Sequence, residues 1–105
     1  MADMRPTAEM AAAAKRGLRL REKFNRGGTE VGVRRAQQLI ERQPLDEADV
    51  KSIHSYFARH EVDKGTKTHS WDSDDDPSAG FIAWLLWGGD AGKEWADRMA
   101  KSLKD

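Results

Sequence analysis

The chain has 105 residues, a formal net charge of zero and no cysteine. A chain of this length forms one domain, and the lack of cysteine excludes disulfide crosslinks and thiolate chemistry. Its mean hydropathy is −0.82 and its longest unbroken apolar run, Phe81 to Trp87, is too short to span a bilayer. We therefore expect a soluble protein that does not contact membranes.

The first two predicted helices are separated by a pair of glycines. A first helix begins after Thr7, which is a suitable N-cap, and runs to about Asn25 before the glycines Gly27 and Gly28. A second helix begins after Thr29 and ends near Arg42, because the proline at position 44 disfavours helical geometry in the residue before it.

The third predicted helix has the strongest start signal in the chain. Asp46 is an N-cap candidate, and Asp49, three residues later, supplies the acidic partner of a capping box. Leu45 and Val50 occupy the two positions of a hydrophobic staple. This helix is expected to end near His60 or Glu61.

A long polar loop is expected over residues 64–76, with Trp71 anchoring it to the core. Residues 1–6 are expected to be flexible. Asp76 followed by Pro77 predicts an N-cap and a first helical residue for a fourth helix over about residues 78–87.

The fourth helix is apolar nearly all round, which predicts that it is the central one. Gly88 and Gly89 end it, with a left-handed conformation expected at Gly88, and Asp90 is predicted to cap a fifth helix. The predicted fold is all-α, a single domain over residues 1–105 in which four to five short helices surround the fourth. The predicted core consists of Phe24, Ile40, Phe57, Ile82, Leu85, Trp87 and Trp95.

The sequence predicts no catalytic residue, no metal site and no cofactor. The acidic run 72–76 departs from a helix–loop–helix calcium site, because Pro77 stands where glycine is needed and Ala83 where the bidentate glutamate belongs. His54 and His60 are six residues apart, which is not a ligand spacing on one helical face, and no cysteine is present to complete a zinc site.

Charge is unevenly distributed along the chain. Residues 1–43 carry ten Lys/Arg and five Asp/Glu, whereas residues 44–105 carry eight and thirteen. Two interpretations are open: the basic half binds a polyanion, or the two halves attract each other within the fold.

The segment Arg26-Gly27-Gly28-Thr29 supports the interpretation that the basic half binds a polyanion, because it places an arginine beside the start of a helix. Backbone amides at a helix start favour phosphate. The candidate nucleic-acid-binding residues are Lys15, Arg16, Arg19, Arg26, Arg34 and Arg35.

Three segments carry a resemblance to a known kind of module. They read VGVRRAQQL, SYFARHEVDK and PSAGFIAWLLWGGDAGKEWADRM, and they fall within residues 31–99. This pattern resembles a small helical module of bacteriophage proteins, found near or fused to head-assembly proteins such as portal or prohead-protease chains. The resemblance implies a viral protein located in the host cytoplasm or the virion, and it carries over no catalytic residue.

The sequence therefore favours a non-enzymatic binding module of phage type that contacts nucleic acid through its basic N-terminal half. The alternative is a protein–protein adaptor in phage assembly or host takeover, acting through an exposed tryptophan or the acidic loop. A salt-dependent gel shift with generic DNA separates these two hypotheses.

Overall fold

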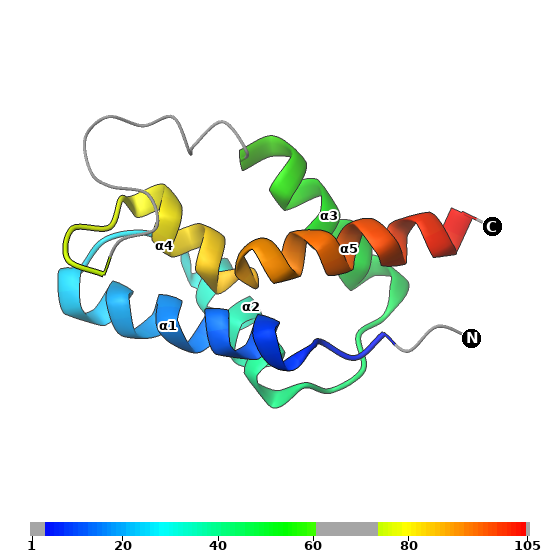
Figure 1. The fold of residues 1–105 in the computed structure, drawn as a ribbon, viewed down its shortest axis with the longest axis horizontal. Helices are drawn as coiled ribbons and strands as arrows, with labels where there is room; N and C mark the ends of the chain where they lie inside the picture. Colours follow the sequence, from blue (N-terminus) through cyan, green and yellow to red (C-terminus); the bar gives the residue numbers. More distant parts are fainter. Residues whose placement is uncertain (1–3, 61–73, 105) are drawn as a thin grey trace.

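The computed structural model describes residues 4–60 and 74–104, and within them the chain forms five helices and no strand. The helices are α1 (Ala8–Phe24), α2 (Glu30–Glu41), α3 (Glu47–His60), α4 (Ala79–Leu86) and α5 (Gly89–Lys104). Helix α4 contacts each of the other four, which confirms the predicted all-α bundle around an apolar central helix. Helix α1 runs along α4 and the start of α5, in the opposite direction (Figure 1).

The first three helices begin where the sequence predicts. The side chains of Thr7 and Thr29 each accept a hydrogen bond from a backbone N–H in the first turn of the helix that follows. Asp46 and Asp49 form the predicted capping box, since the Asp49 N–H donates to Asp46 Oδ1 at 2.8 Å and the Asp46 N–H donates to Asp49 Oδ2 at 3.3 Å. These caps satisfy backbone donors that have no partner inside the helix.

Helix α4 begins later than predicted, because Ser78 rather than Asp76 is its N-cap. The Ser78 Oγ accepts a hydrogen bond from the Phe81 N–H at 3.0 Å, and both Ser78 and Pro77 are buried. Asp76 faces Arg26 instead, with its Oδ1 3.1 Å from Arg26 Nη1. Pro77 therefore lies before the cap and outside the helix.

Helix α5 begins earlier than predicted, at Gly89, and Asp90 is not its cap. The Gly92 N–H donates to the Gly88 carbonyl at 2.9 Å, which makes Gly88 the residue that precedes the first turn. The φ of Gly88 is +112°, a positive value as expected. Asp90 lies in the first turn of α5, where its Oδ1 accepts a hydrogen bond from the indole N–H of Trp84 at 2.9 Å.

Most of the predicted core is buried. Phe57, Ile82, Leu85, Trp87 and Trp95 are buried as predicted, together with Trp84 and Tyr56 from α4 and α3 and Met10 from α1. Phe24 and Ile40 are only half-buried and pack at the edge of the core. The Phe24 ring is flanked by the cations of Lys23 and Arg26, each 5.3 Å from its centroid, which explains its position at the surface.

Two predicted flexible regions overlap the described residues only in part. In the N-terminal segment, the Leu45 N–H donates to the Met4 carbonyl at 2.9 Å, Arg42 Nε donates to the Pro6 carbonyl at 3.0 Å, and Pro6 is buried. Residues 4–6 thus pack against the connection between α2 and α3. Of the predicted loop, only residues 74–76 are described, and the anchoring role of Trp71 lies outside the described residues.

Candidate functional site

The six basic residues selected from the sequence divide into two groups of three. Arg16, Arg26 and Arg35 each form an ion pair with an aspartate from the acidic half of the chain. Lys15, Arg19 and Arg34 are exposed and form no ion pair with any described residue. The attraction between the two halves is therefore present in the fold, and it engages half of the candidate set.

Arg16 and Arg26 hold the short acidic segment formed by residues 74–76. Arg16 Nε lies 2.8 Å from Asp74 Oδ1, and Arg26 Nη1 lies 3.1 Å from Asp76 Oδ1. Both pairs are exposed to solvent, with the arginines 29% exposed and the aspartates 59% and 55% exposed. Exposed ion pairs of this kind contribute little stability each, about 0–1 kcal/mol.

Arg35 has a structural position between α2, α3 and α4. Its Nη1 donates to Asp49 Oδ1 at 2.9 Å, and its guanidinium lies 5.1 Å from the centroid of the Trp87 ring. Burial would raise the pKa of Asp49, but hydrogen bonds from Arg35 and from the Asp46 backbone hold that pKa below its ordinary value. The Arg35 side chain is only 12% exposed, so most of its surface faces the protein and not the solvent.

The exposed face of α1 carries a second set of cations, which form no ion pair with a described residue. Lys15, Arg19 and Lys23 follow one another at intervals of four, so they lie on one side of the helix and are all exposed. We call these three residues the basic stripe. Lys23 is not among the six candidates, although the four-residue spacing in the sequence is the signal that identifies it.

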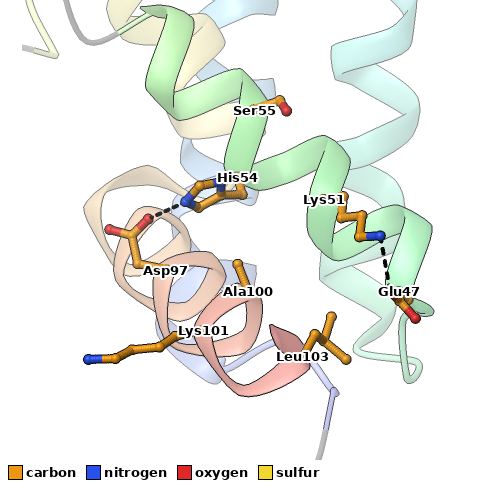
Figure 2. A pocket seen from close by; sticks show the side chains of 8 residues that line it. All are labelled: Glu47, Lys51, His54, Ser55, Asp97, Ala100, Lys101 and Leu103. Carbon is orange, nitrogen blue, oxygen red and sulfur yellow. Dashed lines mark ion pairs between the residues drawn. The ribbon is translucent and has the colours of Figure 1, made fainter. Parts of the chain in front are cut away.

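A groove of about 620 Å³ lies between α3 and α5 and includes none of the six candidate residues. We call it the α3–α5 groove, and Figure 2 shows its lining. The residues that line it are Glu47, Lys51, His54, Ser55, Asp97, Ala100, Lys101 and Leu103. The groove could not be predicted from the sequence, because the pattern of polar residues along α3 does not indicate which helix lies beside α3.

The groove combines an apolar floor with a charged rim. Ala100 and Leu103 point toward α3, and Leu103 is one of two large hydrophobic residues exposed among those described, at 38%. Most rim charges are already paired: Lys51 Nζ lies 3.0 Å from Glu47 Oε1, and both His54 and Lys93 lie 3.3 Å from Asp97. Lys101 forms no ion pair with a described residue, and Figure 2 shows its side chain extending away from α3, on the opposite side of α5 from Leu103.

The groove contains serine, histidine and aspartate side chains, of which the histidine and the aspartate contact each other. His54 Nε2 lies 3.3 Å from Asp97 Oδ1, whereas Ser55 points away from this pair (Figure 2). Adjacent helical residues do not face each other, and Ser55 makes no hydrogen bond to His54. A serine nucleophile is activated by a base within hydrogen-bond reach, and the hydrogen bond between Ser55 and His54 that this would require is not formed.

Among the residues described, no three His, Asp or Glu side chains come together as a set of metal ligands. No helix within residues 4–60 and 74–104 combines the length and the apolar character needed to cross a bilayer.

Comparisons with protein-family models, with curated proteins and with solved structures gave no match. The resemblance to modules associated with phage head assembly therefore stays a prediction.

Proposed function

We propose that this chain is a non-enzymatic adaptor that binds an amphipathic helix of a protein partner in the α3–α5 groove. The observation that carries the proposal is the apolar part of the groove lining, formed by the exposed Leu103 and the half-buried Ala100 and bordered by charges. Grooves of this type accept the apolar face of a helix through side chains spaced by three and four residues.

The charges of the rim define the partner. Because Glu47 pairs with Lys51, and Asp97 pairs with His54 and Lys93, Lys101 is the rim cation free to pair with an added carboxylate. The partner helix would therefore place one large apolar side chain on Leu103 and, farther along, a carboxylate within reach of Lys101, which lies on the opposite side of α5 (Figure 2). If the chain has the phage origin that its resemblance implies, the partner would be a phage or host protein.

A selection from a random library of amphipathic helical peptides tests this proposal. We expect the selected peptides to combine a large apolar residue with an acidic residue, and to shift the backbone NMR signals of α3 and α5. Ala100→Arg should abolish binding, and Lys101→Glu should exchange the preference for acidic peptides for a preference for basic ones.

Val31→Glu is the matched control, because Val31 is the other large hydrophobic residue exposed among those described and lies on α2, away from the groove. It should leave peptide binding unchanged. Peptides that bind with equal affinity to the Ala100→Arg variant would contradict the proposal. So would a chain that forms a dimer in sedimentation analysis and monomerises in the Ala100→Arg variant, because a second copy would then be the occupant.

The second candidate function is nucleic-acid binding through the basic stripe. The observation that favours it is the exposure of Lys15, Arg19 and Lys23 on one face of α1, with no ion pair to any described residue. Contacts from such a face would go to phosphates, because nothing in its composition favours the reading of bases.

A gel shift with generic duplex DNA at several salt concentrations tests this second function. Binding should weaken steeply with salt, since neutralised phosphates release condensed counterions. The triple change Lys15→Gln, Arg19→Gln and Lys23→Gln should abolish the shift. The same shift in parent and triple variant, or no shift for the parent at low salt, would exclude the basic stripe as a nucleic-acid site.

A further inference from the structure

Two arginines of the N-terminal half each hold a carboxylate that comes at least fifty residues later in the chain. Arg16, in the middle of α1, contacts Asp74, and Arg26, two residues beyond the end of α1, contacts Asp76. Both carboxylates come from the acidic segment 74–76. An arginine that binds a carboxylate through its N–H groups presents the donors that a phosphate also requires.

Both guanidinium groups are positioned by contacts that do not involve the carboxylates. Arg16 lies 5.0 Å from the centroid of the Phe81 ring, and Arg26 lies 5.3 Å from the centroid of the Phe24 ring. Arg26 also donates to the Pro77 carbonyl at 3.0 Å. These contacts would hold the guanidinium groups in place if the carboxylates left.

The N-cap of the helix that follows the acidic segment does not come from the segment itself. Ser78 caps α4, and Pro77, which separates the cap from the acidic segment, is buried. The two ion pairs are exposed, and exposed pairs are weak enough to be exchanged for other anions.

We propose that Arg16 and Arg26 bind two phosphates of a nucleic acid. In the free protein, Asp74 and Asp76 occupy the positions of these phosphates, and the nucleic acid displaces the two carboxylates when it binds. This inference rests on the second candidate function. The basic stripe lies on the same helix as Arg16 and would hold neighbouring phosphates, while the acidic segment lowers the affinity by competing for the two arginines.

Fluorescence anisotropy with a short labelled DNA duplex at low salt tests the exchange. The double variant Asp74→Asn and Asp76→Asn should bind about five-fold more tightly than the parent, because the competing carboxylate charges are gone. The matched control is Glu41→Gln with Glu94→Gln, which changes the net charge equally at exposed carboxylates that form no ion pair with a described residue. The control should change the affinity by less than about two-fold.

A second measurement does not depend on any variant. The NMR signal of the Arg16 Nε–H group should shift when DNA is added to the parent chain, because its acceptor changes from a carboxylate to a phosphate. An unshifted signal in a chain that binds DNA would overturn the proposal, as would equal tightening by the two double variants.

These outcomes distinguish the displacement of Asp74 and Asp76 by phosphates from nucleic-acid binding through the basic stripe, on which it rests. If the parent binds DNA through the basic stripe but the Asp74→Asn, Asp76→Asn variant binds no more tightly than the control, only the exchange is wrong. If neither the parent nor that variant binds at low salt, both are wrong. If only that variant binds, the acidic segment blocks the site as proposed.

Discussion

A Cβ atom on Gly17 of α1 would lie 2.9 Å from the Cβ atom of Leu85 on α4. It would also lie 3.0 Å from the backbone nitrogen of Leu86, so neither helix can make room by rotating one side chain. Glycine within a helix costs about 0.5–1 kcal/mol relative to alanine. The close approach of α1 to the central helix offsets that cost and explains the glycine.

Gly17→Ala should therefore lower the free energy of unfolding by about 1–3 kcal/mol, because the two helices must separate to fit one methyl group. Gly32→Ala is the matched control in α2. Its added Cβ would lie 3.4 Å from Trp87 Nε1, an ordinary contact, so this change should be neutral or stabilise by up to about 1 kcal/mol. Urea unfolding measures both, and equal stabilities would show that the helices do not meet at Gly17.

Gly88→Val should destabilise the fold by about 2 kcal/mol or more. The φ of Gly88 is +112°, which a β-branched residue resists, and an added Cβ would lie 3.0 Å from the Gly92 Cα. The close contact is with the backbone of α5, so it cannot be relieved by a side-chain rotation. Thermal unfolding followed by circular dichroism checks this, and a midpoint within about two degrees of the parent would contradict it.

Trp87→Ala and Trp95→Ala should each cost about 3–5 kcal/mol, because both residues are buried, at 8% and 1% exposure. The Trp87 ring also stacks on Tyr56, with ring centroids 4.4 Å apart and planes 3° apart. Trp87→Phe should cost less than Trp87→Ala, since a phenyl ring can keep part of that stacking. A difference of less than about 1 kcal/mol between these two variants in urea unfolding would show that the stacking contributes little.

The Asp49 carboxylate should make the fold sensitive to acid. Its pKa is lowered in the folded state, so its contribution is present above the unfolded pKa and is lost as the pH falls through the folded pKa. Asp49→Asn should lower the stability at neutral pH and flatten the loss of stability below about pH 4. Unfolding free energies measured from pH 7 to pH 2 test this, and parallel curves for parent and variant would contradict it.

Charge reversal should separate Arg34 from Arg35. Arg35→Glu would place a second carboxylate beside the half-buried Asp49, and we expect it to cost at least about 3 kcal/mol. Arg34→Glu changes an exposed side chain without an ion pair to a described residue and should cost less than about 0.5 kcal/mol. Similar unfolding midpoints for the two variants in urea would contradict the buried role of Arg35.

The starts of the first three helices could be predicted from signals that act within one helical turn, whereas the caps predicted for α4 and α5 at Asp76 and Asp90 were wrong. The caps at Thr7 and Thr29 and the capping box of Asp46 with Asp49 are found where the spacing predicts them, because each involves a side chain and a backbone group about three residues apart. The continuous apolar character of residues 81–87 likewise predicts the central position of α4, since a helix without a polar face must be surrounded.

Which elements meet was decided by the tertiary structure alone. The sequence does not indicate that Arg16 and Arg26 pair with Asp74 and Asp76. Asp76 was therefore predicted to cap a helix, whereas in the structure it pairs with an arginine fifty residues earlier in the chain. The α3–α5 groove could not be predicted from the sequence either, because its two sides belong to helices separated by more than twenty residues. Periodicity specifies which face of a helix is buried, whereas its neighbours depend on how all five helices pack together.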